Sequence, residues 1–580
     1  MIQVPVHWLT YSAANPERGR WDQLFIERLL SGEEGRPSYG YRYHDIRPDQ
    51  IETSTGRVIV FSAGHYAENG IADMAVDKLN EYLATLDWSI VIATSDECQT
   101  FPWERIRFPR SSRLWVMLPR VDRDYPDGTR FIGEGSPVSG ADICEYRALT
   151  RDLDLVLIGQ GGHDRRDQAF AAASAITDRR SKVTRTPGVT QGMEQELYLH
   201  AMTRGWIAPA PSGICSQSSF RAYEALEAGC IPILDNSSPQ GNQGFWEMLG
   251  LDKVAPTIDY WRDLPSMVDS LLVNRHENAA HCSARWQQHK RQMLRWLRHD
   301  TDEEFLSTDL PWDDITVIVP TSPVPSNPDL SMIQQTIESV RVNLPGSEIL
   351  ITCDGVRDEQ LDRKSDYDVF LHELCMWTNT QYNVWPFLHH THQHQSGMMH
   401  HILREVDTPF VLYVEHDAPL EGHIPFDEIV RTMNWDNLNS MRFLHEVAIP
   451  PGSEHLFLDH ETILPSDASR VPYARTIQWS QRPHLARTEW YRQVMAENFA
   501  PDARTMIEDV MHGVAQANTY AGRIRAHKAW ERWRMAVYAP EGSWKRSGHY
   551  NGRGDDPKFS MLMKYPDGVR PEGAPPEGWQ

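Results

Sequence analysis

Two carboxylates flank a histidine in the segment Glu415-His416-Asp417, directly after the apolar run 409–414. A run this short and apolar is typical of a buried strand in a parallel sheet. Ligands of such sheets collect at the carboxyl ends of the strands, and carboxylate oxygens there can hold a divalent cation against a phosphate. A solvated acidic turn would have the same local sequence. The surrounding residues therefore have to distinguish a metal–phosphate site from a plain turn.

Three further features lie where such a site would need them. Asp354 follows the strand predicted at 348–352 and could accept hydrogen bonds from a base or ribose, although Asp-Gly also simply forms turns. Glu508 and Asp509 open a predicted helix, where the helix dipole favours acidic side chains and where one carboxylate could act as a general base. His549 lies in a glycine-flanked loop and could be a metal ligand.

The order of these features over residues 313–550 resembles the family 2-like glycosyltransferases of the GT-A fold. Enzymes of that family open with an apolar strand, here Val317–Pro320, and carry a glycine before the helix that precedes the metal strand, here Gly397. The resemblance implies that Gly397 and Asp354 belong to the binding site of a nucleotide-sugar donor, with UDP as the expected nucleotide. It also implies that the acidic triplet binds Mn²⁺ or Mg²⁺ together with the donor diphosphate.

The same resemblance assigns roles to the acidic residues and to the late histidine. Asp417 would be the direct metal ligand, Glu415 a supporting contact and His549 a further ligand. Asp509, with Glu508 as the second choice, would deprotonate the acceptor hydroxyl in an inverting transfer. Glu415 stands where the family has Asp, so a variant that depends less on metal is an alternative.

Two groups of residues near these motifs could contact substrates. Trp479, Gln481 and His484 lie in and after a strand-like run that precedes the acidic helix, and they could line an acceptor pocket. Six histidines between 389 and 401 do not have the spacing of a structural zinc site. We therefore favour donor or acceptor contacts for one or two of them.

A second constellation lies in the segment 218–234, SSFRAYEALEAGCIPIL. It reads as a helix that carries carboxylates, a glycine stop and a buried strand, and it resembles the exostosin-type glycosyltransferases in the nucleotide-binding half of a GT-B fold. The resemblance implies that three residues at the helix N-terminus face the donor diphosphate, a favourable place for anions, and that one residue binds the ribose. The three are Ser218, Ser219 and Arg221, and the ribose ligand is Glu224. The alternative is an amphipathic helix without a ligand site that ends at a glycine, which would explain part of the segment 218–234.

Residues 1–150 resemble that family only in outline. They contain no convincing acceptor-side base, and His65 and Asp96, near predicted strand ends, are the candidates. Whether this half catalyses a reaction or is an accessory is therefore open.

Short apolar runs alternate with helical patterns through most of the 580 residues, which predicts an α/β protein with parallel sheets. A chain this long needs more than one hydrophobic core. We expect a GT-B-like pair of Rossmann-type domains, with the acceptor-side half at 1–150 and the nucleotide-sugar-binding half at 151–305. A GT-A domain at 306–580 would follow an acidic connector.

Composition restricts the partners and the compartment. The net charge of −23 argues against a surface-wide grip on nucleic acid, but the local basic segments 283–299 and 523–546 combine cations with aromatic rings and could contact DNA. The seven cysteines are scattered and predict no disulfide framework, which favours a reducing cytoplasm. We find no signal peptide and no membrane span in the sequence, so we expect a cytoplasmic protein, in the host cytoplasm if it is viral.

The sequence thus predicts a two-module glycosyltransferase that uses nucleotide sugars. The favoured acceptor is hydroxymethylated pyrimidine in DNA, as for virus-encoded enzymes such as those of bacteriophages, and the two modules could add two sugars in sequence. A polysaccharide or other glycan is the alternative acceptor. A non-catalytic sugar- or nucleotide-binding protein with degenerate modules and a nucleotidyltransferase are alternatives of other classes.

Overall fold

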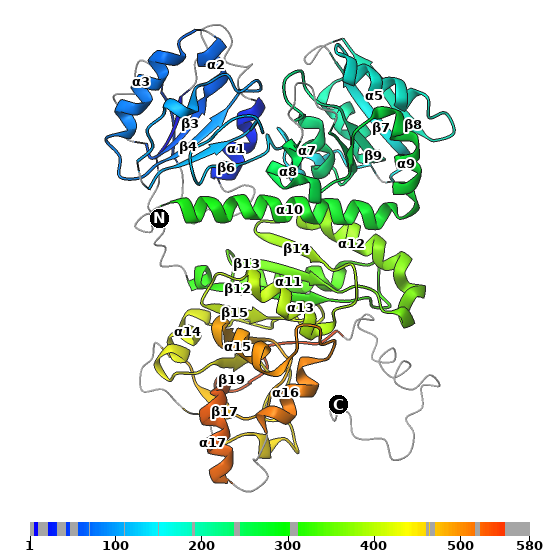
Figure 1. Cartoon of the computed structure of the whole chain (residues 1–580). Coiled ribbons are helices and arrows are strands. Elements are labelled where there is room, and N and C mark those ends of the chain that lie inside the picture. Colours follow the sequence, from blue (N-terminus) through cyan, green and yellow to red (C-terminus); the bar gives the residue numbers. More distant parts are fainter. Residues whose placement is uncertain are drawn as a thin grey trace. The chain divides into compact units, whose positions relative to one another are not determined.

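The structure is a computed structural model, and it describes most of the chain. The described residues are 5–9, 21–31, 42–46, 56–68, 70–109, 111–148, 150–187, 192–236, 244–301, 311–459, 463, 470–516 and 523–550. The chain forms two compact units (Figure 1). The first consists of Met1–Thr308 and Leu374–Trp385, and the second of Asp309–Glu373 and Pro386–Gln580. The three predicted domains 1–150, 151–305 and 306–580 stay a prediction.

The first unit contains two parallel sheets, as the alternating sequence pattern predicts. The strand order of the first sheet is β2-β1-β3-β4-β5-β6. Its strands are β1 (Pro5–Leu9), β2 (Arg42–Ile46), β3 (Val58–Ser62), β4 (Ile90–Thr94), β5 (Arg113–Val116) and β6 (Arg130–Phe131). Its helices include α1 (Trp21–Ser31), α2 (Ala63–Glu68) and α3 (Ala72–Leu83). All five residues of β3 and of β4 are buried, which explains why these strands are apolar on both faces.

The strand order of the second sheet is β11-β10-β9-β7-β8. Its strands are β7 (Leu153–Gln160), β8 (Ser181–Thr186), β9 (Gly205–Ala210), β10 (Ile231–Asp235) and β11 (Thr257–Ile258). The helices around it are α4 (Gly140–Glu145), α5 (Asp164–Ser174), α6 (Gln195–Arg204), α7 (Phe220–Glu227), α8 (Phe245–Leu249) and α9 (Leu264–Val273). The loops at the carboxyl ends of β7 and β9 therefore lie at one edge of this sheet.

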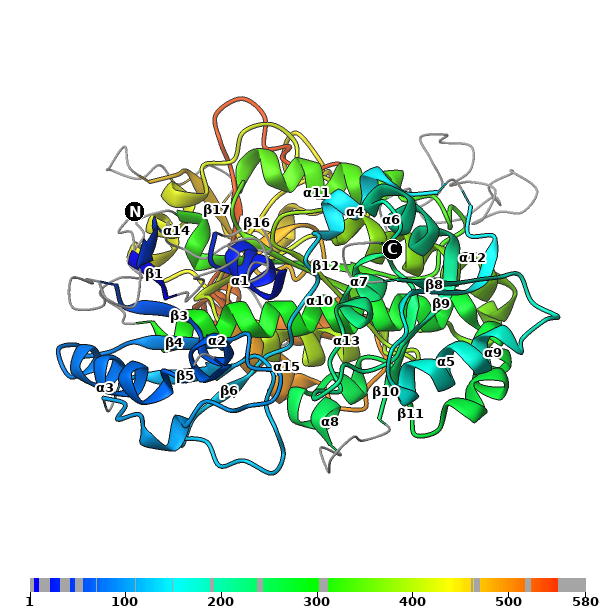
Figure 2. The same cartoon turned by 90° about the horizontal axis from the view of Figure 1, so that it is seen from above.

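The long helix α10 (Arg275–Asp300) connects the two sheets of the first unit. One hydrophobic core contains Val60 and Ile92 of the first sheet, Ile207 and Ile233 of the second, and Trp286 of α10. Figures 1 and 2 show α10 running along both sheets, with β3–β5 toward one end and β9–β11 toward the other. The two sheets therefore share a core, and the helix is part of it.

The segment Leu374–Trp385 adds to this core from much later in the chain. The Asn379 side-chain amide donates to the Glu227 carboxylate at 2.7 Å, and the Lys290 ammonium lies 3.0 Å from the same carboxylate. Both charged side chains are almost completely buried. The ion pair is thus desolvated, and Asn379 supplies one of the hydrogen bonds that such a pair requires.

A disulfide joins Cys98 to Cys215, 117 residues apart, whereas the scattered cysteines predicted no disulfide framework. The remaining five cysteines form no disulfide. The bond was not predictable because connectivity does not follow from scattered positions in a sequence. Within the described ranges, no helix is both long enough and apolar enough to span a membrane.

The second unit contains a mixed sheet with the strand order β14-β13-β12-β15-β18-β16-β19-β17. Its strands are β12 (Ile315–Thr321), β13 (Glu348–Cys353), β14 (Val384–Leu388, which begins within the segment of the first unit), β15 (Phe410–Tyr413), β16 (Ser440–Arg442), β17 (Tyr473–Thr476), β18 (His484–Arg487) and β19 (Met535–Tyr538). Its helices include α11 (Ser331–Asn343), α12 (Lys364–Thr378, which continues into the first unit), α13 (His394–Ile402), α14 (Phe426–Trp435), α15 (Thr488–Asn498), α16 (Ile507–Ala515) and α17 (Arg523–Trp533). β12 pairs in parallel with β13 and β15, so these three strands end at the same edge.

Candidate functional sites

The acidic triplet of the second unit lies just beyond the end of β15, as the sequence predicts. Glu415 and Asp417 are partly buried there. The ring of His416 turns toward the Pro320 carbonyl of β12, at 3.2 Å. Since His416 is engaged with the sheet, the two carboxylates are the members of the triplet that are available to a ligand.

Glu415 is the more constrained of the two carboxylates. Its Oε1 accepts hydrogen bonds from the Gln395 amide at 2.8 Å and from the Tyr413 hydroxyl at 3.1 Å. Burial, and repulsion from Asp417 and Glu508, raise the pKa of Glu415 well above its usual range. A cation placed among these carboxylates would relieve that repulsion.

His549 meets Asp417 across 132 positions of sequence. Its Nε2 lies 3.5 Å from Asp417 Oδ2. Two backbone bonds hold the loop in place, from the Tyr550 amide to the Asp417 carbonyl at 2.7 Å and from the Gly548 amide to the Pro419 carbonyl at 2.8 Å. A carboxylate and an imidazole side by side can both ligate Mn²⁺. Glu415 is the second carboxylate of the site, although the ligand atoms of Glu415, Asp417 and His549 do not all lie within 4.8 Å of one another.

Gln395 of α13 links this site to the start of α16, and sequence reasoning missed it. Its Oε1 accepts from the Ile507 amide and from the Gln481 side chain, each at 3.2 Å. The Gln481 backbone amide donates in turn to Glu508 at 3.1 Å. Its place two residues before Gly397 is the one signal that could have marked it.

The two acidic residues of α16 differ in their surroundings. Glu508 is committed to the Gln481 amide. Asp509 is exposed, and within the described part of the chain no group donates a hydrogen bond to its carboxylate. A carboxylate that acts as a general base needs a lone pair that can take the proton of the acceptor hydroxyl. This difference favours Asp509 over Glu508, and the catalytic role itself stays a prediction.

Gly397 allows the segment before α16 to lie against α13. The neighbouring Ser396 hydroxyl donates to the Ala503 carbonyl at 2.9 Å and accepts from the Thr505 amide at 3.1 Å. A Cβ added at Gly397 would come within 3.2 Å of the Arg504 guanidinium and 3.0 Å of a Gln393 carbon. Gly397 thus acts on the position of α16, and its predicted donor contact remains untested.

Asp354 is engaged with its own loop. Its carboxylate, in a residue only 2 % exposed, accepts from the backbone amides of Gly355, Gln393 and His394. His394 has φ +55°, an uncommon conformation for a residue other than glycine. In this structure Asp354 therefore fixes the turn into α13, and its contact with a nucleotide stays a prediction.

The residues expected at the acceptor are buried. Trp479, Gln481 and His484 are each 3 % exposed. The His484 ring stacks on Tyr413 at 5.2 Å, and burial lowers the pKa of His484 to about 4, so the ring is neutral. Trp479 packs on Trp490. This burial favours a supporting role at β18, the strand that pairs with β15, over the predicted contact with an acceptor.

A cavity of about 430 Å³ lies at the carboxyl ends of β7 and β8 and the start of α7 in the first unit. It is lined by all four residues that the segment 218–234 predicts to bind the nucleotide-sugar donor, namely Ser218, Ser219, Arg221 and Glu224. Arg166, in the arginine segment after β7, also lines it, and sequence reasoning missed three further residues of its wall, namely Glu97, Glu134 and Tyr198. They come from separate loops and helices, so no local pattern in the sequence connects them.

Two guanidinium groups give this cavity a positive region. Arg221 lies over Gly159, where an added Cβ would be 1.8 Å from the Arg221 Nη2, and the buried Nε of Arg221 has no hydrogen-bond partner. Burial, followed by repulsion from Arg221, lowers the pKa of the Arg166 guanidinium. An anion between the two groups would relieve the repulsion and supply the missing partner.

The start of α7 faces the same cavity. Ser219 is the N-cap residue but makes no side-chain cap, so the first amides of the helix are not satisfied by it. The Ser218 hydroxyl donates to Glu134 at 2.5 Å. The Glu224 carboxylate accepts from the Tyr198 hydroxyl, and burial raises the pKa of Glu224. A helix N-terminus without a side-chain cap, beside two arginines, forms an arrangement suited to a phosphate.

Neither acceptor-side candidate of residues 1–150 is supported as a base. Asp96 is 2 % exposed and accepts from the Thr100 and Phe101 amides, so it shapes its own turn. The side chain of His65 lies outside the described residues. Glu97 and Glu134 are the carboxylates from this region that line the cavity.

No protein-family model and no curated protein matches this chain. Among solved structures, TarS from S. aureus is 15 % identical over 41 % of this chain and 36 % of its own, with a TM-score of 0.26. TarS 1–349 in complex with UDP-GlcNAc is 14 % identical over 40 % and 58 %, with a TM-score of 0.25. GalNAc-T7 with UDP, GalNAc and Mn²⁺ is 11 % identical over 42 % and 45 %, with a TM-score of 0.27. The chain thus spans less than two thirds of each of these structures, and at such scores we build no argument on the likeness.

Proposed function

We propose that the protein is a glycosyltransferase that moves a sugar from a nucleotide-sugar donor to an acceptor hydroxyl. The observation that carries this proposal is the convergence of Glu415, Asp417 and His549 at one sheet edge, next to the acidic start of α16. The two carboxylates belong to one turn, and His549 comes from a loop 132 positions later. Carboxylates that repel one another beside an imidazole suit a divalent cation and a diphosphate better than they suit a structural role.

In the proposed reaction, Asp417, Glu415 and His549 would hold Mn²⁺ or Mg²⁺, and the ion would supply positive charge beside the departing diphosphate. Asp509 takes the proton of the acceptor hydroxyl. The acceptor oxygen forms a bond to the anomeric carbon as the bond from that carbon to the diphosphate breaks, and the configuration inverts. Gln395 hydrogen-bonds both Glu415 and the first residue of α16. It therefore fixes the distance between the proposed metal site and the helix that carries Asp509.

The cavity of the first unit is proposed as a second site for a nucleotide sugar. Arg166, Arg221 and the first turn of α7 would bind the diphosphate, and Glu224 the ribose. This arrangement supports a GT-B-like module beside a GT-A-like one. Whether the first unit transfers a second sugar or only binds nucleotide depends on an acceptor-side base. Glu97 and Glu134 line the cavity, but each already accepts hydrogen bonds, Glu97 from the Cys215 and Ser216 amides and Glu134 from the Ser218 hydroxyl.

For the acceptor, hydroxymethylated pyrimidine in DNA stays a prediction with a glycan as its alternative. The basic segment 283–299 lies in α10, where Trp286, Lys290 and Arg291 are buried. In α17, Trp530 and Trp533 are 7 % and 4 % exposed. Trp286, Trp530 and Trp533 are therefore not available to DNA bases, whereas Trp296 and Trp544 are partly exposed. A DNA interaction would rest on these two rings and on phosphate contacts from the remaining cations.

A screen of donors against acceptors tests the proposal. The full-length protein is incubated with UDP-sugars and Mn²⁺, with hydroxymethylated DNA, unmodified DNA and glycans as separate acceptors, and products are read by mass spectrometry. We expect a mass gain of one or two sugars on one acceptor class and release of UDP. Release of pyrophosphate from a nucleoside triphosphate instead would identify a nucleotidyltransferase, and nucleotide binding with neither reaction would identify a non-catalytic binding protein.

A further inference from the structure

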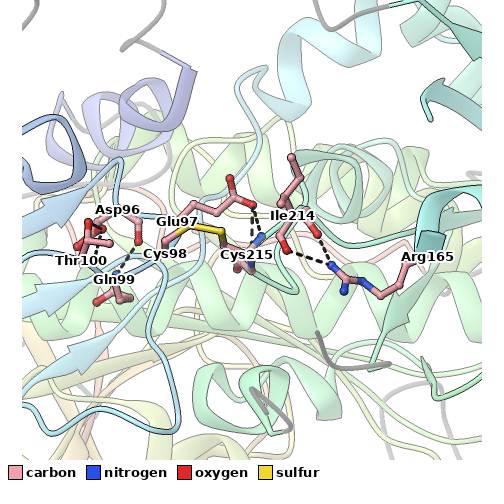
Figure 3. Close-up of a disulfide and its surroundings, with 10 residues drawn as sticks. Asp96, Glu97, Cys98, Gln99, Thr100, Arg165, Ile214 and Cys215 are labelled. Carbon is pink, nitrogen blue, oxygen red and sulfur yellow. Dashed lines mark hydrogen bonds between the residues drawn. A yellow bond between two sulfur atoms is a disulfide. The ribbon is translucent and has the colours of Figure 1, made fainter. Parts of the chain in front are cut away.

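The Cys98–Cys215 disulfide joins two loops that belong to different sheets of the first unit (Figure 3). Cys98 follows β4 of the first sheet, and Cys215 follows β9 of the second. Both loops leave the carboxyl ends of parallel strands, which is where ligands of such sheets bind. Gly213 and Ser218, on either side of Cys215, line the cavity of about 430 Å³.

Glu97, next to Cys98, reinforces the link between the loops. Its Oε1 accepts hydrogen bonds from the Cys215 amide at 3.2 Å and from the Ser216 amide at 3.5 Å, as Figure 3 shows. Glu97 also lines the cavity, and its charge acts on Arg166. The loop of the first sheet thus holds the residues that directly precede Ser218.

The second sheet holds the two ends of the same loop. The Arg165 guanidinium donates to the Ser212 hydroxyl at 2.7 Å and to the Gly213 carbonyl, and the Gln217 side chain donates to the Asn236 carbonyl at 3.2 Å. Between those ends, Arg165 also reaches the Ile214 carbonyl at 3.4 Å, whereas Cys215 and Ser216 are held from outside the loop by the disulfide and by Glu97. The segment directly before Gln217 and Ser218 is therefore held by the loop of the first sheet.

We propose that the Cys98–Cys215 disulfide is a positioning element of the cavity. It holds the segment Gly213–Ser216 so that Ser218, Ser219 and the first turn of α7 are presented to a nucleoside diphosphate, and the oxidised protein binds this ligand more tightly than the reduced protein. The inference rests on the proposed role of the cavity as a nucleotide site.

The bond is accessible to a reductant, because Cys98 is exposed and Cys215 partly exposed. A dithiol attacks one sulfur of the disulfide, and exchange with its second thiol releases the other. The protein gains two electrons and two protons and ends as two thiols, while the dithiol becomes a disulfide. An oxidising disulfide reagent reverses the change, so the effect on binding is reversible.

The experiment measures UDP binding by calorimetry in the full-length Asp417→Asn protein with EDTA, which silences the site of the second unit. Peptide mapping without reductant first establishes the Cys98–Cys215 bond. UDP affinity is then measured in oxidised, dithiothreitol-reduced and reoxidised protein, and in the Cys98→Ser/Cys215→Ser variant. Cys144→Ser removes a free, partly exposed cysteine of the same unit and is the matched control.

We expect reduction to weaken UDP binding by about tenfold, the loss of one well-placed contact, and reoxidation to restore it. The double serine variant should bind as the reduced protein does in either redox state, whereas Cys144→Ser should respond like its parent. Equal UDP affinity in the oxidised and reduced states, or unpaired Cys98 and Cys215 in air-oxidised protein, would overturn the inference.

Hydrogen exchange of segment 213–219 separates this inference from the proposed function and does not depend on the serine variant folding. Faster exchange on reduction of the unmodified protein supports the positioning role. Exchange that does not change on reduction overturns it. If the oxidised protein binds no UDP at all, the proposed function of the cavity is wrong, and the exchange result alone then judges whether the disulfide positions the loop.

Discussion

The first unit offers a ligand two guanidinium groups and a helix N-terminus, whereas the second unit offers carboxylates and an imidazole. Both sites lie at the carboxyl ends of parallel strands. Arg166 and Arg221 attract a diphosphate directly. Glu415 and Asp417 repel one unless a cation lies between them and the phosphates. The same ligand class can therefore be bound at two places of equal topology, through guanidinium groups at one and through a cation at the other, and the need for metal should distinguish them.

Chelation should give the largest difference between the sites. With Mn²⁺ present, we expect the chain to bind two UDP molecules, and EDTA should abolish binding at the second unit because its carboxylates then repel the diphosphate. Calorimetry with and without EDTA measures the stoichiometry. Two UDP molecules bound in EDTA would show that the second site needs no cation.

Asp417→Asn should lower sugar transfer by the second unit on the order of 10³-fold, since several kcal/mol of charge stabilisation are lost. Asp427→Asn is the matched control, because Asp427 is an exposed acid of α14 paired with Arg431. Steady-state rates of UDP release measure both variants. A rate for Asp417→Asn equal to that of Asp427→Asn would remove Asp417 from the site.

Arg221→Ala should weaken UDP binding at the first unit by about 10- to 100-fold, the usual range for a lost hydrogen bond to a charged group. The loss should be the same with and without Mn²⁺. Arg179→Ala, on the exposed pair with Asp269, should leave the affinity unchanged. Calorimetry in the Asp417→Asn background measures the effect. An Arg221→Ala protein that keeps full affinity would place the anion elsewhere.

Gly397→Ala should destabilise the second unit by about 1–3 kcal/mol through overpacking, and it should slow transfer because the start of α16 moves. Gly513→Ala is the contrasting change, since an added Cβ there meets nothing within 4 Å. That variant should be neutral or more stable by up to about 1 kcal/mol. Thermal unfolding and transfer rates measure both. Equal stability of the two variants would mean that the Ala503–Thr505 segment can move away at no cost.

The sequence predicted the parts of the molecule that local pattern determines. Short apolar runs gave the parallel strands, and motif order brought Asp417 and His549 to one place and Ser218, Arg221 and Glu224 to another. The apolar pattern of the sequence shows where a strand ends, but it does not show which distant side chains contact that end. Gln395, which contacts Glu415 and Ile507, was therefore missed. The Cys98–Cys215 bond was missed for the same reason.

Burial limited the prediction in a second way. Trp479 and His484 have side chains that suit an acceptor pocket, but the same aromatic character suits the protein interior at β18, where the structure buries them. A single sequence does not separate these environments, because both select large, flat side chains with a polar atom.

The return of Leu374–Trp385 to the first unit has a consequence for synthesis of the chain. When residue 308 leaves the ribosome, Glu227 and Lys290 are already made, but Asn379, which hydrogen-bonds both, is still to come. The nascent first unit therefore carries an incompletely satisfied buried charge pair until about 70 more residues have been added, a wait of several seconds at ordinary rates of translation. A polypeptide that stops after residue 308 would keep that defect permanently, so the first unit should fold fully only from chains that extend beyond residue 385.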